Sequence, residues 1–262
     1  MKYLRIHSDL HLEQWYGMPA QKLADRLIPE HENDGDSILI LAGDISSKID
    51  QLLEFLNTLA RFSRVVYIPG NHEFYGHDLN SWEAKVAEGL KSLPNILCPL
   101  TGVAAFEFDN CQIIAGTLWA DGGKDEAEQA RVEISLRDFY VTAFQGERWT
   151  VDSMRKVNKV HHDQIDQLLK AQSDKVRIVA THHMPSYRLC HPRFGNEING
   201  GFACNCEDIL AYDHAPDIWI HGHTHDFIDT KLWKTHIICN PSGYRSEHNN
   251  GFSSAGNFFV EI

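Results

Sequence analysis

Five short stretches of this 262-residue sequence place an acid, an amide or a histidine directly after an apolar run. The clearest is residues 69–73, Pro-Gly-Asn-His-Glu, which follow the apolar residues 65–68. Proline and glycine end a strand and turn the chain. Open α/β sheets bind ligands in the crevice outside the carboxyl ends of their strands, so we expect the amide, imidazole and carboxylate of this stretch to face such a crevice.

Similar stretches recur at four other predicted strand ends, and they contain the following side chains: Asp9 and His11, Asp44, His182 and His183, and His223 and His225. On extended backbone, residues two apart share a side and neighbours point apart. By this rule, Asp9 and His11 point to one side, as do His223 and His225. Only one of the adjacent residues His182 and His183 can enter a given site, and Asn71 and Glu73 point away from His72. Gly222 lets the backbone come close at the last motif. Asp44 alone could simply cap the next helix.

Collected together, the strand-end groups are Asp9, His11, Asp44, Asn71, His72, His182, His223 and His225. They supply three oxygen donors and four imidazoles for metal binding, with one imidazole left over. One tetrahedral zinc ion needs only four protein ligands, so seven ligands indicate two ions that share a carboxylate. The donor set contains no thiolate, so Mn²⁺ is the expected ion and Fe or Zn²⁺ are the alternatives, rather than Mg²⁺ alone. Independent polar residues that each close a turn would explain one or two of these motifs but not five.

The elements that must position these groups are those of an α/β fold. The continuous apolar run at 37–42 predicts a strand buried on both faces, and the apolar stripe in 49–60 predicts a helix. With the strand at 65–68 they form a βαβ unit with parallel strands. Further helices are predicted at 78–93, 124–139 and 151–172, a hairpin turn at 109–110, and strands at 3–6, 96–98, 104–108, 111–116, 176–180, 218–220, 230–233, 236–239 and 258–262.

Two less regular segments are predicted to lie over the site, within a single domain that spans residues 1–262. The first is 117–155, and the second is the loop-rich segment 185–208. Trp119 from the first and Tyr187 from the second could stack a nucleobase. The first segment is also compatible with a surface excursion that never touches substrate.

Composition limits the partners of this chain. The net charge is −12, and without clustered Lys and Arg we expect no stable binding of duplex nucleic acid. No apolar run approaches the ~18 residues of a membrane span, and residues 1–11 lack the apolar core of a secretory signal. The six scattered cysteines form no C-x-x-C pair, which favours reduced thiols and a cytoplasmic location over a zinc ribbon.

In chain order, the motifs D-x-H, GD, GNHE, a strand-end histidine and GHTH resemble those of the calcineurin-like metallophosphoesterase superfamily, over residues 9–225. The resemblance implies an α/β sandwich of two mixed β-sheets flanked by helices, with a two-metal site at one end. It implies the following ligands: Asp9, His11 and His225 for the first ion, Asn71, His182 and His223 for the second, and Asp44 as the bridge. It also implies that His72 faces the substrate without binding metal.

One position departs from the family pattern. Members often read GDxxD, where the second acid holds the histidine of the GNH motif, and here Ser47 stands at that position. The residue that orients His72 is therefore not evident from the sequence.

The resemblance implies hydrolysis of a phosphate ester by attack of a metal-bound hydroxide, with His72 protonating the leaving oxygen. We expect a small phosphodiester, such as a cyclic nucleotide or a nucleotide-like compound. The alternative is a phosphomonoesterase, including a phosphoprotein phosphatase. No arginine stands in a clear phosphate-clamping motif, although Arg188, Arg193 and Arg245 lie in loops. A non-catalytic protein-binding scaffold on the same fold is the alternative of another class, and such a protein could lose ligands, whereas none is missing here.

Overall fold

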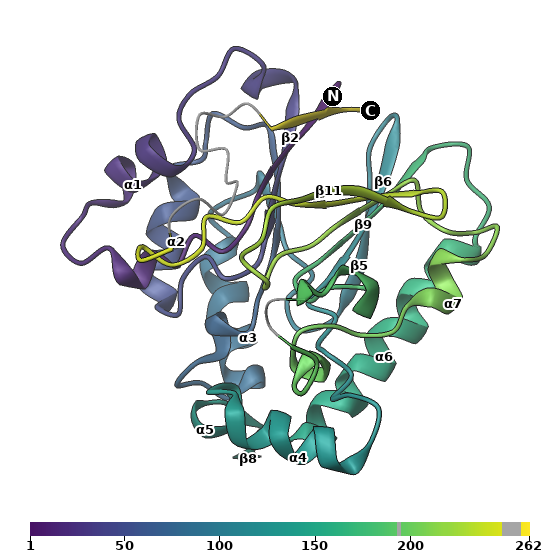
Figure 1. Cartoon of the computed structure of the whole chain (residues 1–262). Helices are drawn as coiled ribbons and strands as arrows, with labels where there is room; N and C mark the ends of the chain where they lie inside the picture. The colour runs from purple at the N-terminus through teal and green to yellow at the C-terminus, as the bar shows by residue number, and fades with distance from the viewer. Residues whose placement is uncertain (193–194, 248–257) are drawn as a thin grey trace.

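The computed structural model describes residues 1–192, 195–247 and 258–262. They form two mixed β-sheets that pack face to face and carry helices on their outer faces, as the sequence predicted (Figure 1). The first sheet has the order β13 (Phe259–Glu261), β1 (Tyr3–His7), β2 (Ser37–Ala42), β3 (Arg64–Ile68) and β4 (Ile96–Leu97). The second has the order β11 (Ile228–Leu232), β12 (Thr235–Cys239), β10 (Ile218–Ile220), β9 (Val176–Thr181), β6 (Cys111–Gly116) and β5 (Val103–Glu107).

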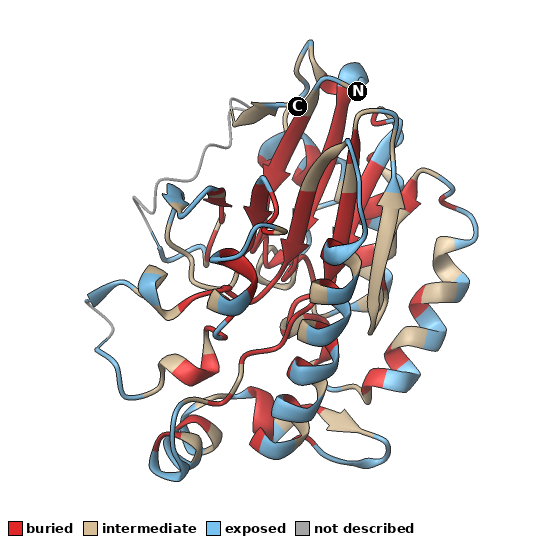
Figure 2. Ribbon diagram, turned by 90° about the vertical axis from the view of Figure 1, so that its right-hand side faces the viewer, coloured by how far each residue is buried: buried red, intermediate tan, exposed pale blue. Residues whose placement is uncertain are grey.

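The central strands are buried on both faces. In β2, Ile38 and Ile40 pack in the layer between the sheets, while Leu39 and Leu41 pack beneath the outer helices. A strand covered on both sides has no solvated face, which explains its continuous apolar run. Figure 2 shows the strands of this layer as an almost unbroken buried block, with helices that are buried on one side only.

The helices cover the outer faces of the two sheets. Helices α1 (Ala20–Leu27), α2 (Ile49–Asn57) and α3 (Leu79–Leu90) lie over the first sheet, and α6 (Val151–Lys170) and α7 (Glu207–Leu210) lie over the second (Figure 1). The unit β2–α2–β3 is parallel, as predicted. Among the described residues, no helix is both long and apolar enough to cross a membrane.

Parallel pairing brings the carboxyl ends of the central strands to one end of the molecule. Strand β2 runs parallel to β1 and β3, and β9 runs parallel to β6 and β10. The predicted strand-end motifs therefore all emerge at the same end. The hairpin predicted at residues 109–110 joins the antiparallel strands β5 and β6.

The segment 117–155 is more divided than predicted. The expected helix at 124–139 is two helices, α4 (Glu126–Ser135) and α5 (Asp138–Val141), followed by a small hairpin of β7 (Ala143–Phe144) and β8 (Glu147–Arg148). This segment packs on the segment 185–208. The N–H of Gly122 donates to the carbonyl of Gly200 at 2.8 Å, and a Cβ on Gly200 would lie 2.1 Å from the nitrogen of Gly123.

A buried histidine connects α6 to this segment. Nδ1 of His161 accepts the N–H of Leu118 at 3.3 Å, and its Nε2–H donates to the carbonyl of Thr101 at 2.9 Å. Both ring nitrogens are thus satisfied in the neutral form. Burial lowers the pKa of His161 to about 4.

We expect this histidine to make stability depend on pH. Its pKa in the folded protein lies below its value in the unfolded chain, about 6.5, so the unfolded chain binds more protons between these two values. The free energy of unfolding should therefore fall as the pH falls from about 6.5 to about 4, by at most about 3 kcal/mol from this group. Urea unfolding across this range should show a shallower pH slope for His161→Gln than for wild type. The exposed change Lys156→Gln on the same helix should keep the wild-type slope, and equal slopes for all three proteins would contradict the assignment.

Candidate metal centre

The structure brings all eight strand-end groups together. Three overlapping sets of possible ligand atoms lie within 4.8 Å of one another: Asp9, His11 and His225; His11, Asp44 and His72; and Asp44, His182 and His223. Asn71 joins them, because its Oδ1 lies 2.9 Å from Nε2 of His182. Of the adjacent histidines, His182 faces the cluster, while the ring of His183 packs against those of Trp119 and His223.

The backbone that positions these groups is not the extended backbone we predicted. Asp9, His11, Asp44, His223 and His225 have φ values of 54°, 44°, 55°, 70° and 51°, and they are five of the nine non-glycine residues with positive φ in the described part of the chain. The left-handed conformation costs a non-glycine residue about 1–2 kcal/mol. The prediction that strand alternation aligns each two-apart pair is therefore wrong in its reason, although the side chains do meet.

The same correction applies after β3. Asn71 has right-handed helical angles, and His72–Phe74 form a 3₁₀ turn, so strand alternation does not direct the neighbours of His72. Asp44 is not a helix cap either. Helix α2 begins only at Ile49, and Oδ1 of Asp44 accepts the N–H of His72 at 2.9 Å.

Glu73 fixes the turns after β2 and β3 to each other. Its fully buried carboxylate accepts the N–H groups of Ile45 (2.7 Å), Gly70 (2.8 Å), Asp44 (3.1 Å) and Ser46 (3.4 Å). Burial, and then the charge of Asp44, raise the pKa of Glu73 to about 7, while the surrounding N–H groups lower it. The four backbone donors that face its two oxygens stabilise the ionised form.

Two glycines allow the close approach of these loops. Gly43 has a φ of +88°, and a Cβ there would lie 2.1 Å from Nδ1 of His182. A Cβ on Gly222 would lie 2.6 Å from the carbonyl oxygen of Ala42 and 2.8 Å from Oδ2 of Asp9. The close backbone approach predicted at Gly222 is therefore confirmed.

The first set of side chains leaves two nitrogen lone pairs facing each other. Nδ1 of His11 lies 3.2 Å from Glu13, and Nδ1 of His225 lies 2.7 Å from Glu247, so both Nδ1 atoms carry the proton. The Nε2 atoms of His11 and His225 are 3.0 Å apart, and Nε2 of His225 is 3.5 Å from Oδ1 of Asp9. Burial alone would lower the pKa of His225, but Asp9 and Glu247 raise it to about 10. Without metal, a proton on Nε2 of His225 supplies the positive charge between the two rings, and a bound cation would supply it instead.

The second set has the same property. His182 donates from Nδ1 to the carbonyl of Ala42 at 2.9 Å, so its Nε2 presents a lone pair to Oδ1 of Asn71 at 2.9 Å and to Asp44 at 3.4 Å. Acceptors at these distances need a positive charge between them. Burial would lower the pKa of His182, but Asp44 raises it to about 9. Nε2 of His223 lies 3.3 Å from the carbonyl oxygen of Gly201, so Nδ1 is the ring nitrogen that remains for a metal.

Residues of the segment 117–155 hold Asn71 in this orientation. Its Nδ2 donates to the hydroxyl of Tyr75 at 3.2 Å, and that hydroxyl donates to Asp138 of α5 at 3.0 Å. Partners of this kind fix ligand orientation and commonly affect metal affinity. Sequence reasoning missed this chain of hydrogen bonds, because nothing in the sequence relates Asp138 to residues 71–75.

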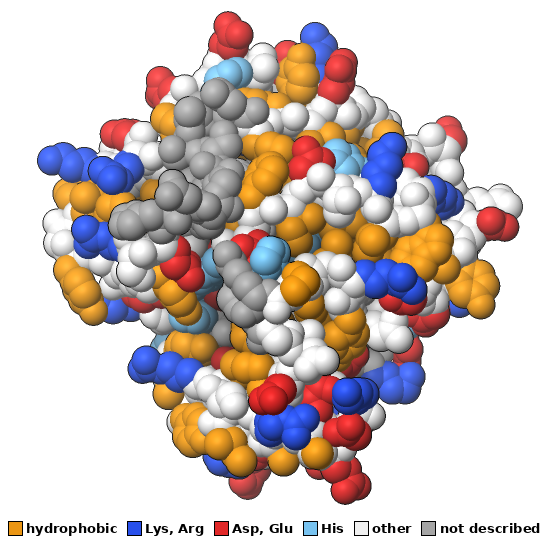
Figure 3. Space-filling view, in the orientation of Figure 1, with side chains coloured by type: hydrophobic (Ala, Val, Ile, Leu, Met, Phe, Trp, Pro, Cys, Tyr) orange, Lys and Arg blue, Asp and Glu red, His pale blue; other side chains and the backbone are white. Residues whose placement is uncertain are grey.

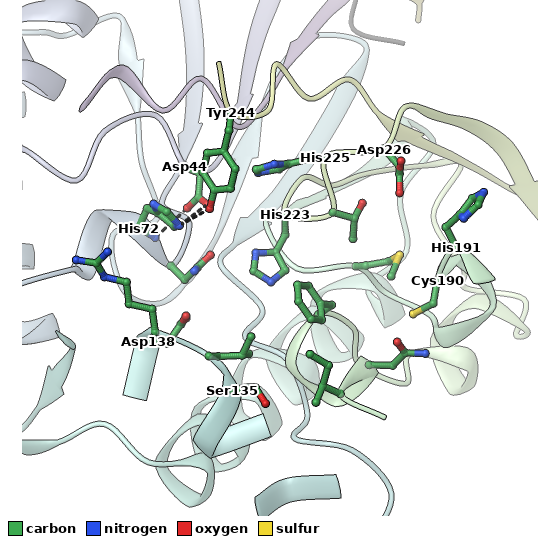
Figure 4. A pocket seen from close by; sticks show the side chains of 18 of the residues that line it. Asp44, His72, Ser135, Asp138, Cys190, His191, His223, His225, Asp226 and Tyr244 are labelled. Carbon is green, nitrogen blue, oxygen red and sulfur yellow. Dashed lines mark hydrogen bonds and ion pairs between the residues drawn. The ribbon is translucent and has the colours of Figure 1, made fainter. Parts of the chain in front are cut away.

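His72 stands beside the ligand groups and faces the cavity. Its ring stacks on Tyr75 with centroids 4.2 Å apart, and its Nε2 lies 3.3 Å from the hydroxyl of Tyr244 and 3.9 Å from Oδ2 of Asp44 (Figure 4). Tyr244 was also missed, although its loop follows β12 as the other motifs follow their strands. That loop is bound to the end of β1, since the N–H of Gly243 donates to the carbonyl of Asp9 at 3.0 Å.

A cavity of about 400 Å³ opens over these groups. Its polar lining includes metal-site residues and Tyr244, and its apolar lining comes from the segments 117–155 and 185–208 and from Met184, just before the second segment. The apolar lining residues include Leu136, Met184, Leu189, Ile198 and Phe202.

Those aromatic and arginine side chains noted in the sequence that the structure describes do not line this cavity. Trp119 is 1% exposed and packs on Trp149, so it cannot stack a base, and the Tyr187 hydroxyl donates to Asp121. Arg188 pairs with Glu207, and Arg245 donates to Gln14. Arg193 lies outside the described residues. Within residues 1–192, 195–247 and 258–262, the arginine that lines the cavity is Arg137, which sequence reasoning missed.

Comparison with known proteins identifies the class. The family model for calcineurin-like phosphoesterases matches residues 6–227. The chain is 26% identical to the uncharacterized protein L509 of Acanthamoeba polyphaga mimivirus, over 95% of this chain and 94% of that protein. It is also similar in structure to a phosphopantetheinyl hydrolase from Mycobacterium tuberculosis, with a TM-score of 0.71 and 15% identity, over 99% of this chain and 95% of that chain. At this identity the second likeness shows a shared fold.

The family match covers most of the chain, and the chain belongs to the calcineurin-like phosphoesterase family. It is therefore a metal-dependent phosphoesterase, a hydrolase of phosphate esters. The candidate ligand sets described above are the part of this chain that suits divalent metal ions.

We expect Glu73→Gln to destabilise the fold. An amide keeps one acceptor oxygen and turns an N–H₂ group toward two backbone donors, which should cost about 2–3 kcal/mol. Urea unfolding in chelator measures this cost without any contribution from metal. The matched change Glu54→Gln lies on an exposed position of α2 and should cost little. If both variants are as stable as wild type, the four N–H bonds to Glu73 do not hold these turns.

Proposed function

We propose that this chain is a two-metal phosphoesterase that hydrolyses a small phosphodiester, such as a cyclic nucleotide or a nucleotide-like compound. The observation that supports this proposal is the chain of three overlapping ligand sets, in which His11 links the first set to the second and Asp44 links the second to the third, beside one cavity. In the metal-free site, the converging ligand atoms are balanced by protons on His182 and His225, whose pKa values are raised to about 9 and about 10, and bound cations would supply that positive charge instead.

The ligands would divide between two ions as follows: Asp9, His11 and His225 for the first, Asn71, His182 and His223 for the second, and Asp44 between them. When bound, such ions lower the pKa of a coordinated water to about 7 and neutralise charge on the phosphate oxygens. We propose Mn²⁺ as the native ion, because the set combines carboxylate, amide and imidazole donors without a thiolate.

His72 is the residue we propose to act on the leaving group. Burial alone would lower its pKa, but Asp44 and Glu13 raise it above the usual value, so the ring can hold a proton at neutral pH. Its Nε2 faces the cavity beside the Tyr244 hydroxyl. From there it can donate a proton to the oxygen that leaves phosphorus, a role that typically contributes about 10²–10⁴ in rate.

The segments 117–155 and 185–208 would act as the cap of this single domain. They supply the apolar wall of the cavity, so a substrate with an apolar or ring-shaped group next to its phosphate would fit. On the face in Figure 3, acidic and basic side chains are interspersed, and no continuous field of Lys and Arg is visible. This supports a small substrate over duplex nucleic acid. The six free thiols support a cytoplasmic location.

A phosphomonoesterase is the second candidate, and Arg137 is the observation that favours it. This arginine lines the cavity, with its guanidinium 5.9 Å from the ring of Tyr75. A guanidinium can bind two oxygens of a phosphate at once, which suits a dianionic monoester. The third candidate, a scaffold without activity, is disfavoured because the ligand sets are complete.

Metal removal tests the proposal directly. Purified protein should hold up to two transition-metal ions per chain, prolonged chelation should abolish hydrolysis, and Mn²⁺ should restore it. Asp44→Asn removes the charge shared by both sets, so metal content and rate should fall together. Asp36→Asn makes the same change at an exposed position and should alter neither. Full activity in excess chelator, or an Asp44→Asn protein with both metals and normal rate, would overturn the two-metal proposal.

Substrate class is tested with bis(p-nitrophenyl) phosphate and p-nitrophenyl phosphate at neutral pH. We expect the diester to have the larger kcat/KM. If Arg137 binds a dianion, Arg137→Ala should lower kcat/KM for the monoester by about 10- to 100-fold and change the diester little. Arg64→Ala, at an exposed position of β3, serves as the control. If the wild-type protein prefers the monoester and Arg137→Ala loses that preference, the proposed function becomes a phosphomonoesterase.

A further inference from the structure

We propose that Glu13 takes over the role of the acid that this chain lacks at Ser47, and that it is the positioning residue for His72. The inference rests on the proposed function, because the orientation of His72 matters only if this residue acts on substrate. It assigns a role to a side chain that lies outside all five strand-end motifs.

The Glu13 carboxylate lies between the two loops concerned. Its Oε1 is 3.5 Å from Nδ1 of His72 and 3.2 Å from Nδ1 of His11, and its Oε2 accepts the backbone N–H of Ser47 at 3.3 Å. The acid is thus anchored on the backbone of the very position where the family pattern has its own acid. A carboxylate can only accept at these contacts, so it favours the proton on Nδ1 of His72.

Backbone pairing carries Glu13 to this place. The N–H of His11 donates to the carbonyl of Asp44 at 3.0 Å, and the N–H of Leu12 donates to that of Ile45 at 2.9 Å. The loop after β1 therefore advances beside the loop after β2 one residue at a time. The next residue, Glu13, lies in a 3₁₀ turn at Leu12–Gln14 that is held by the buried Leu12. This register leaves the Glu13 side chain beside the N–H of Ser47.

The other contacts of His72 explain why one fixed nitrogen orients the whole ring. One face stacks on Tyr75, and the opposite nitrogen, Nε2, points to the cavity and to Tyr244. With Nδ1–H directed at Glu13, Nε2 is the nitrogen that remains to exchange a proton with substrate. Without Glu13 the ring would lose the acceptor that sets its tautomer and its rotation.

A simpler role for Glu13 is to support His11 alone, as a partner of one metal ligand. The two roles differ in what they predict. Support of His11 affects metal content and lowers the rate equally for all substrates. Positioning of His72 lowers the rate more for a leaving group that must be protonated as it departs than for one that leaves readily as an anion.

The test compares Glu13→Gln, His72→Ala and the double variant on methyl phenyl phosphate and methyl p-nitrophenyl phosphate, two diesters that differ only in the leaving group. Because Glu13 also orients His11, the assays use saturating Mn²⁺; under these conditions we expect Glu13→Gln to keep its KM and to lower kcat by about 10- to 100-fold for the phenyl ester. The loss should be clearly smaller for the p-nitrophenyl ester. In the His72→Ala background, Glu13→Gln should cause no further loss, because residues that act as a unit are not additive. Glu30→Gln, at an exposed position, is the control for lost charge.

A second readout does not depend on activity. Couplings between the ring protons and ring nitrogens of His72, measured by NMR in metal-free protein at pH 9, report which nitrogen is protonated. We expect Nδ1–H in wild type and in Glu30→Gln, and a shift toward Nε2–H in Glu13→Gln. If the protein shows no esterase activity, the proposed function fails while this measurement still tests the contact.

Three results would overturn the inference. The first is an unchanged His72 tautomer in Glu13→Gln. The second is an equal loss of rate on both esters that accompanies lost metal, which would assign Glu13 to His11. The third is a full additional loss when Glu13→Gln is combined with His72→Ala.

Discussion

The candidate site depends on one buried carboxylate that carries no ligand role. Glu73 accepts four backbone N–H groups from the turns after β2 and β3, and it has no exposure to solvent. Among the described residues these N–H groups have no backbone carbonyl as acceptor, so without this carboxylate they would be buried and unsatisfied. The bonds place Asp44 and Asn71, which follow neighbouring parallel strands, against the same side of His182.

Strain in the backbone is concentrated at the same place. Five predicted site residues adopt the left-handed conformation, which few residues other than glycine tolerate. The two sheets supply the stability that offsets this, because their central strands are buried on both faces and pair in parallel. Backbone strain concentrated at one end of the sheets indicates that the site needs a geometry that regular strands cannot provide.

Each imidazole of the cluster is oriented through its second nitrogen by a different part of the chain. His11 uses Glu13, His182 uses the carbonyl of Ala42, His223 uses that of Gly201, and His225 uses Glu247. The Gly201 contact is notable because it lies in the segment 185–208, which also forms the apolar wall. Asp138 makes a similar connection from the segment 117–155 through Tyr75 to Asn71. The walls of the cavity and the ligand geometry are therefore mechanically linked.

The sequence by itself determined the α/β class and the order of nearly all strands and helices, because long apolar runs and helical stripes are local signals, whereas the two mixed sheets were implied by the family resemblance of its motifs. It also determined which eight side chains would meet, since parallel strands bring their carboxyl ends to one edge. It did not determine how they meet. We expected extended backbone, and the chain uses left-handed and 3₁₀ turns whose angles are imposed by contacts such as Glu73 with residues 44–46.

Only the tertiary structure decided the surroundings of these groups. Glu13, the adjacent pair Arg137 and Asp138, and Tyr244 come from three separate segments, and their relation to the site arises from the packing of loops against one another. The same packing buried Trp119, which its aromatic character alone had marked for substrate. Strand-end chemistry can be read from a sequence because it directly follows an apolar run, whereas the partners that orient it depend on register between loops, which no local pattern encodes.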